Sequence, residues 1–308
     1  MRSVGARAAL LASCLAGLLL PFMLIARPWY RGWGADAQLR TAPLPGDGLL
    51  WQGAPRETRA IRIEAPAGRV WPWVAQIGQD RAGFYSYRVL ENLVGCRMPD
   101  LDYLVPALQH WDDGDKLWMY PSDAGGGIGQ APLALHVPGR ALVFYTRRPG
   151  TGLDHPPDGT WAFVVEPIDA RASRLVMRSN ARGTLGLLGA GFESNVFEPI
   201  HFAMERKMME GIKARAEGRP VPAWRDDVQV ALWAVTFALF VVSAILVLRG
   251  RAPGPHAVTF TAAGLLFAAL TLLQPGVLLG TPLVALLGAA TWLAGQPGWA
   301  GQRGSPRR

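Results

Sequence analysis

The stretch TRAIRIEAPAGRVWPWVAQIG, residues 58–78, contains two hydrophobic periods that meet at Pro66. Before the proline, apolar and charged residues alternate, and this period of two predicts a half-buried strand over residues 58–65. After it, apolar residues recur at helical spacing as far as Gly78, and proline suits the first turn of a helix. The stretch therefore predicts a strand that passes directly into a helix.

Downstream, a second short helix is predicted at residues 87–94, closed by Gly95, a residue suited to a left-handed helix end. The period then falls back to two in five short segments separated by turn-rich pieces. These segments are residues 116–120, 133–137, 141–147, 160–166 and 174–181. Their short spacing and tight turns predict an antiparallel meander.

A long amphipathic helix is predicted at residues 193–217. One apolar face carries Val196, Phe197, Ile200, Met204, Met208 and Gly211. The order of elements is strand, two short helices, antiparallel strands and one long helix. It predicts an α+β domain over residues 55–218, in which a curved antiparallel sheet grips the C-terminal helix.

Apolar, charge-free stretches lie on both sides of this domain. Residues 8–26 and 228–248 are each about as long as the roughly 20 residues that a membrane-spanning helix needs. Residues 252–302 are too long for one span and are broken at a Gln-Pro-Gly turn, so we expect spans at 257–273 and 276–294. Two spans followed by a re-entrant hairpin is the alternative. The first stretch is interpreted as an uncleaved signal-anchor, and the Pro-, Gly- and Trp-rich residues 27–54 as a linker.

The net charge of +8 comes largely from arginines beside the spans, which is typical of membrane flanks and not of a nucleic-acid surface. With four spans, the basic amino tail, the loop with Arg249 and the basic carboxyl tail share one side. The positive-inside rule makes that side cytoplasmic, so the domain of this cell-membrane protein is expected outside the cytoplasm. Arg27, Arg31 and Arg225 count against this orientation, since they flank spans on the domain's side.

The two cysteines cannot form a disulfide framework, and Cys96 has no His or second Cys at metal spacing. The acidic turn before residue 116 lacks the alternating ligands of a calcium loop. No metal and no cofactor is therefore expected.

Several pieces of the domain together resemble a known family. They are VWPWVAQIGQDRAGFYSY at 70–87, LEN at 90–92, GD at 114–115, TWAF at 160–163 and HFAMERKMM at 201–209. This set resembles bacterial membrane-attached members of the SRPBCC (START-like) superfamily. The resemblance covers residues 55–218 and implies a helix-grip fold with a hydrophobic ligand cavity under the long helix. It implies no single activity, because that fold serves carriers, receptors and enzymes.

The candidate ligand-binding residues fall into a polar and an apolar group. The polar group is a cluster at the helix–turn–helix corner, which would orient an amphipathic ligand; its members are Gln76, Arg81, Tyr85, Tyr87 and Glu91. A purely structural role is the alternative, with Arg81 pairing Asp80 or Glu91. The apolar group would line the cavity and comprises Trp73, Trp161, Phe163, Phe197, Met204 and Met208. His201 lies near the edge of this face, with Glu205 one turn later to hold its tautomer.

The favoured function is a membrane-tethered module that binds a lipid or another hydrophobic small molecule. A cyclase- or dehydratase-type enzyme would place convergent polar groups deep in the cavity, whereas a carrier would keep them at its mouth. A ligand-sensing regulatory membrane protein is the third alternative; it would lack an adequate cavity or expose a large apolar patch.

Overall fold

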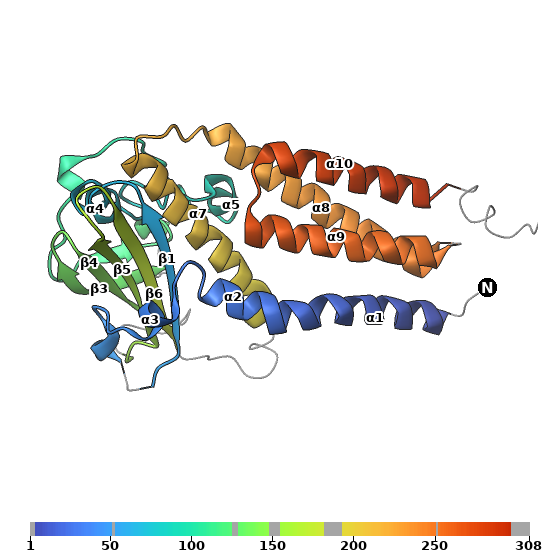
Figure 1. Cartoon of the computed structure of the whole chain (residues 1–308), viewed down its shortest axis with the longest axis horizontal. Helices are drawn as coiled ribbons and strands as arrows, with labels where there is room; N and C mark the ends of the chain where they lie inside the picture. The colour runs from blue at the N-terminus through green and yellow to red at the C-terminus, as the bar shows by residue number, and fades with distance from the viewer. Residues whose placement is uncertain are drawn as a thin grey trace, which may run out of the picture. The chain divides into compact units, whose positions relative to one another are not determined.

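The computed structural model describes residues 4–50, 53–124, 129–147, 155–181, 193–250 and 252–296. The chain divides into two compact units (Figure 1). One is Pro28–Pro222, and the other combines Met1–Arg27 with Ala223–Arg308. Each unit is described by itself.

The unit Pro28–Pro222 is an α+β domain built on one six-stranded sheet. Every neighbouring pair is antiparallel, in the order β1-β6-β5-β4-β3-β2. The strands are β1 (Arg56–Ile63), β2 (Lys116–Trp118), β3 (Gln130–Val137), β4 (Ala141–Thr146), β5 (Gly159–Pro167) and β6 (Ser173–Ala181). The predicted α+β class and antiparallel meander are confirmed. The pairing of β1 with β6 joins the first strand to the last.

Helices of this unit lie before, between and after the strands. They are α2 (Arg27–Arg31), α3 (Ala37–Thr41), α4 (Ala67–Ala75), α5 (Arg88–Leu93) and α7 (Glu198–Ala216), with 3-10 turns at Asp47–Leu49, Pro106–Leu108 and Ser122–Ala124. A π-helical turn, Glu193–Phe197, precedes α7. Helix α4 ends earlier than predicted, because Gly78 lies at a positive φ of 130° and pairs with Gly83 in an isolated bridge.

One face of the sheet is covered by α4 and α7 (Figure 1). Alternate residues of β5, such as Trp161 and Phe163, point toward these helices into the main hydrophobic core. Helix α7 approaches the backbone closely at Gly211, where an added Cβ would lie 2.4 Å from the Tyr85 carbonyl oxygen. Only glycine allows that approach, so this residue fixes the depth at which α7 packs.

The opposite face of the sheet is covered by residues 35–47, which lie within the linker predicted at 27–54. Leu39 and Leu44 pack there in a second apolar cluster with Val143 and other sheet residues. Arg178 of β6 secures the segment: its guanidinium donates to the carbonyls of Leu39 at 2.8 Å and Ala42 at 2.9 Å, and contacts Asp47 at 2.6 Å. The sequence did not predict this packing, because the segment shows no sustained hydrophobic period of a helix or a strand.

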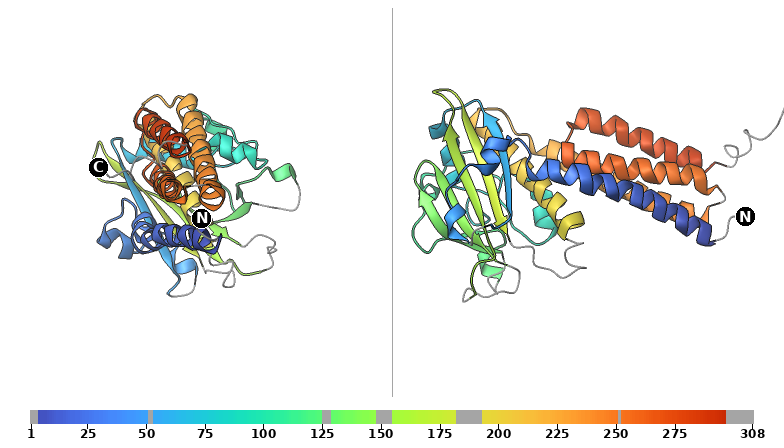
Figure 2. Two further views of the ribbon diagram at one scale, coloured as in Figure 1. Left: turned by 90° about the vertical axis from the view of Figure 1, so that its right-hand side faces the viewer. Right: turned by 60° about the horizontal axis from the view of Figure 1, so that its bottom comes forward.

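The second unit contains four helices that are long and apolar enough to cross a membrane. Their elements are α1 (Val4–Pro21) with the π-helical Phe22–Ala26, α8 (Ala223–Arg249), α9 (Pro253–Leu273) and α10 (Val277–Ala294). They run side by side (Figure 2). A hydroxyl pair, Thr259 Oγ1 to Ser243 Oγ at 3.0 Å, links α9 to α8. These four helices fit a membrane location. The expected turn at residues 274–276 separates α9 from α10.

Candidate functional site

A buried ion pair joins the first strand of the sheet to helix α7. Arg59 follows Thr58 and precedes Ala60, which packs against the opposite face, so strand alternation points Arg59 toward α7. There its guanidinium contacts the carboxylate of Glu205, and each side chain is only 1% exposed. Arg59 also donates to the Tyr30 carbonyl at 2.9 Å and to Glu57 at 2.7 Å. A buried charge is tolerated when it is paired and hydrogen-bonded in this way.

The Glu205 carboxylate has two further neighbours. Trp161 Nε1 donates to Glu205 Oε1 at 3.4 Å, and His201 Nδ1 lies 3.8 Å from Oε2. The distance of 3.8 Å is too long for a hydrogen bond, but it is short enough for the fixed negative charge of Glu205 to act on the imidazole. The predicted approach of Glu205 to His201 is therefore present, and Arg59 already neutralises the carboxylate.

His201 lies between two aromatic rings at the edge of this buried cluster. Its ring centroid is 5.7 Å from that of Phe197 and 5.8 Å from that of Trp161. Its side chain is 36% exposed. Desolvation by the surrounding protein lowers the pKa of His201 below its ordinary value, against the opposing attraction of Glu205. The imidazole is therefore neutral at pH 7 and can both donate and accept a hydrogen bond.

Apolar side chains surround this imidazole. Phe197 is exposed on one side of it, and Ile200 is exposed on the same turn of α7. On the other side Trp161 is buried and stacks on Phe84, with ring centroids 6.1 Å apart. The arrangement offers apolar contact together with one partly exposed polar group, which is the combination that orients an amphipathic molecule.

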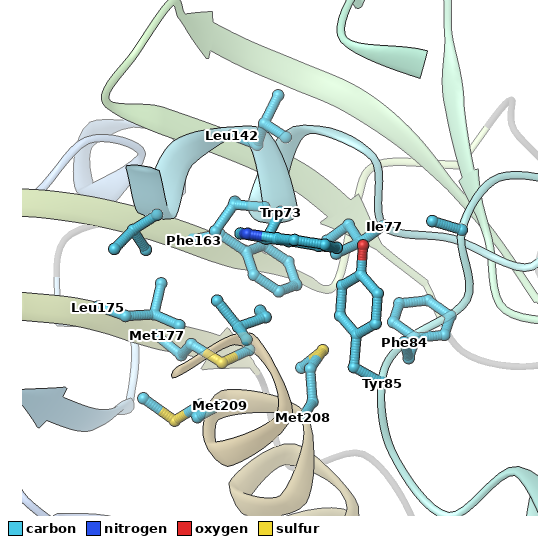
Figure 3. Packing of buried hydrophobic residues seen from close by; sticks show 14 of the residues in the cluster. Trp73, Ile77, Phe84, Tyr85, Leu142, Phe163, Leu175, Met177, Met208 and Met209 are labelled. Atoms are coloured by element: carbon cyan, nitrogen blue, oxygen red, sulfur yellow. The ribbon is translucent and has the colours of Figure 1, made fainter. Parts of the chain in front are cut away.

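The other predicted apolar residues lie deeper. Trp73, Phe163 and Met208 belong to the main hydrophobic core, where they pack with Tyr85 and Met177 (Figure 3). Met204 is half-buried, and its backbone carbonyl accepts a hydrogen bond from Ser86 Oγ at 2.8 Å. The predicted set thus separates into core members and an outer group of Phe197, His201 and Met204, with the buried Trp161 packed between the core and His201.

Gln76 and Tyr85 of the polar cluster are structural ties. The Gln76 amide nitrogen donates to the Tyr85 hydroxyl at 3.0 Å and to the Tyr103 carbonyl at 3.1 Å. Its amide oxygen accepts from the Val105 backbone N–H at 3.0 Å. Burial raises the pKa of Tyr85, so its hydroxyl stays protonated. Tyr85 also adopts a positive φ of 56°, a strained conformation that this network holds in place.

The expected partners of Arg81 were wrong. Its guanidinium does not pair with Asp80 or Glu91 but donates to backbone carbonyls, those of Leu108, Ala75 at 3.2 Å and His110 at 3.1 Å. It also lies 4.2 Å from the centre of the Trp111 ring. All three carbonyls are contacted by one guanidinium nitrogen, Nη2, and sequence spacing carried no sign of these acceptors.

Tyr87 and Glu91 lie on the α5 side of the domain. Tyr87 is buried, and Lys207 Nζ of α7 lies 5.5 Å from the centre of its ring. Glu91 is half-buried, and its Oε2 has no hydrogen-bond partner among the described residues. Desolvation, with a smaller contribution from Asp100, raises the pKa of Glu91 to about 7.

The candidate site therefore centres on His201, Glu205, Arg59, Trp161 and Phe197. Arg59 was missed as a site residue because its charge within an alternating strand is typical of the solvent-facing side. A signal was present in the sequence: in an alternating strand Arg59 points to the same side as Ile61 and Ile63, which pack in the main core. Within the described parts of the chain, no group of three or more His, Cys, Asp or Glu side chains is placed to hold a metal ion.

No family model matches this chain, and no curated protein matches it at a significant level. Solved structures show partial similarity. A solution NMR structure from Thermobifida fusca is 18% identical, with 54% of this chain and 97% of that chain covered and a TM-score of 0.33. A crystal structure from Mesorhizobium loti is 12% identical, with 53% and 99% covered and a TM-score of 0.30. One from Bordetella parapertussis, solved by NMR, is 15% identical, with 57% and 81% covered and a TM-score of 0.28. At these values the similarities assign neither a family nor a function.

Proposed function

We propose that the α+β domain is a START-like domain of the SRPBCC superfamily with the helix-grip fold, tethered to the cell membrane. The sequence motifs support this proposal, as does the order of elements: strand, two short helices, antiparallel strands and a long helix that packs across the sheet. In this proposal the domain binds a lipid or another hydrophobic small molecule beside α7.

The observation that carries the proposal is the environment of His201. A partly exposed neutral imidazole lies between the rings of Phe197 and Trp161 and is held beside the buried Glu205 carboxylate. The aromatic rings offer apolar contact area to a ligand, and the imidazole offers one hydrogen bond to its polar end. A molecule with an apolar body and a hydroxyl or carboxyl group matches this arrangement.

The packing of the domain places the proposed binding site nearer the N-terminal end of α7 than the sequence predicted. Phe163 and Met208, which were expected to line a cavity, instead belong to a core that extends under the second half of the helix. The first half presents Phe197, His201 and the half-buried Met204. We therefore place the ligand between the first half of α7 and the start of β5, where Trp161 lies.

The proposal is tested first by native mass spectrometry of the full chain released from nanodiscs. A bound species with the mass of one lipid or other apolar molecule, retained after the annular lipids are stripped, is the expected result. A second test titrates the chain with a fluorescent fatty acid, using protein-free nanodiscs as the background.

Two variants and one matched control make this titration specific. Met204→Trp fills space beside the site, and His201→Leu removes the polar anchor; each should weaken probe binding about tenfold, equivalent to ~1.4 kcal/mol. Met119→Trp makes the same exchange at an exposed position and should bind as the native chain does. Circular dichroism checks that each variant folds. Native affinity in both site variants would refute binding at this place.

A further inference from the structure

An exposed apolar surface of the α+β domain lies where α7 begins. Phe197 is 55% exposed and Ile200 is 53% exposed, and Val196 is exposed next to Phe197 in the turn that precedes α7. Large apolar side chains that gather on the outside of a domain mark an interaction surface. We call Val196, Phe197, Ile200 and the exposed Trp29 the apolar rim.

Trp29 is held against α7 by contacts within the same domain. Its ring centroid lies 5.9 Å from that of Phe202, in an edge-to-face arrangement. The next residue, Tyr30, stacks on Phe202 at 5.3 Å and donates a hydrogen bond from its hydroxyl to Glu198 at 3.1 Å. The first turns of α7 are therefore fixed beside residues 29 and 30.

The covalent chain determines where Trp29 lies relative to a membrane. The helical segment Val4–Arg31 is continuous, and Arg27 is the first charged residue after the charge-free residues 8–26. At a rise of ~1.5 Å per residue, Trp29 lies only ~3 Å along the helix beyond Arg27. Tryptophan and arginine at the end of a span are the residues of the membrane–water interface. If α1 spans the bilayer, Trp29 is at that interface and the rest of the apolar rim lies close to it.

We infer that the apolar rim inserts into the interfacial region of the lipid bilayer that α1 crosses. The chain returns to the same membrane face at the start of α8, where Trp224 is exposed and the Arg225 guanidinium lies 5.6 Å from the centre of its ring. The occupant of the rim is thus the lipid interface, because both ends of the domain hold it there. This inference does not require ligand binding: Phe197 belongs to both surfaces, but Ile200, which the test uses, belongs only to the rim.

The test places an environment-sensitive dye at two isoleucines of the full chain. Ile200→Cys lies in the rim, and Ile168→Cys is an exposed position just beyond β5. Trp161, beside His201, lies near the start of β5 and Pro167 ends it, so the control lies ~20 Å along the strand from the rim side. Both are made in a chain with Cys14→Ser and Cys96→Ser, labelled with a nitrobenzoxadiazole dye, and placed in phosphatidylcholine nanodiscs.

The expected result is a blue-shifted emission at position 200 that lipids with a spin label near the glycerol backbone quench severalfold. Position 168 should show water-like emission without quenching. Water-like, unquenched emission at position 200 would overturn the inference. A blue shift without quenching would also overturn it, since protein and not lipid would then cover the rim. Equal quenching at both positions would refute insertion by this particular surface.

Discussion

Arg59 on strand β1 and Glu205 on helix α7 form an ion pair that is almost completely buried, although 146 residues separate them in the chain. The pair joins the strand that opens the sheet to the helix that covers it. It also places a fixed carboxylate beside His201. The same ion pair therefore stabilises the fold and forms part of the candidate site.

Replacing Arg59 with Met should destabilise the domain by ~3–5 kcal/mol, because it leaves the Glu205 carboxylate buried and uncompensated. Thermal unfolding of the full chain in nanodiscs measures the loss. The double variant Arg59→Met, Glu205→Leu should recover most of it. Arg62→Met on the same strand breaks an exposed pair with Glu64, just past the strand's end, and should change the midpoint little. A single Arg59→Met variant as stable as the native chain would contradict the role of the pair.

The stability of the folded chain should depend on the protonation of His201. Burial lowers the pKa of His201 from its ordinary 6.5, while Glu205 raises it. The unfolded chain therefore binds this proton first, so folding stability falls as pH decreases below 6.5. Nuclear magnetic resonance titration of the imidazole should give a pKa below 6.5. In a Glu205→Gln variant it should be lower still, because the carboxylate's attraction is gone and the charge of Arg59 remains. A native value above 6.5 would contradict this account.

The protonation of Glu91 should affect the pH dependence of folding stability in the direction opposite to that of His201. Desolvation raises its pKa from 4.5 to about 7, so the folded chain holds this proton more tightly than the unfolded chain does. Stability conferred by the protonated carboxyl is present below pH 4.5 and is lost as pH rises through 7. Glu91→Gln should therefore raise the unfolding free energy at pH 8 by on the order of 2 kcal/mol relative to the native chain. The gain should shrink toward pH 5, and an equal effect at both pH values would argue against this titration.

Arg81→Lys should destabilise the domain without changing ligand affinity. Lysine keeps the charge but loses the planar guanidinium, which stacks over the Trp111 ring while its Nη2 contacts three backbone carbonyls. We expect a cost of ~1–3 kcal/mol in thermal unfolding and native binding of the fluorescent fatty acid. Weaker binding with unchanged stability would instead show that Arg81 orients the ligand.

The domain should lie outside the cytoplasm. Alkaline phosphatase fused after Arg219 should be active in a bacterial host, and green fluorescent protein fused at the same point should be dark. The reason is the positive-inside rule applied to the short segments around Arg7 and Arg249. The remaining basic residues behind this expectation, at positions 2, 251, 303, 307 and 308, lie outside the described residues. The reverse pattern of activities would place the domain in the cytoplasm.

The local elements of this protein could be predicted from its sequence because they depend on local periodicity. The alternation of residues 58–65, Pro66 and the helical spacing that follows produce β1 and α4 within a few residues of their predicted bounds. The four apolar helices follow in the same way from uninterrupted runs without charge. In each case, neighbours in the chain decide the outcome, and a single sequence contains that information.

The candidate site was only partly predictable. His201, Glu205, Phe197 and Met204 share one end of α7, so helical spacing brought them together. Spacing could not show that Phe163 and Met208 would be absorbed into the core, since the same apolar residue suits a core or a ligand site. That distinction depends on which side chains fill the space opposite.

The partners of buried charges were decided by tertiary structure alone. Arg59 meets Glu205, Arg81 meets the carbonyls after residue 107, and Arg178 holds the segment of residues 39–47. These contacts join parts of the chain far apart in sequence, and no local pattern encodes them. A buried guanidinium must find acceptors wherever the fold supplies them, because leaving it unpaired costs several kcal/mol. The sequence by itself therefore determined the elements and the apolar spans, and only the packing of the sheet against α7 and residues 35–47 decided what each arginine does.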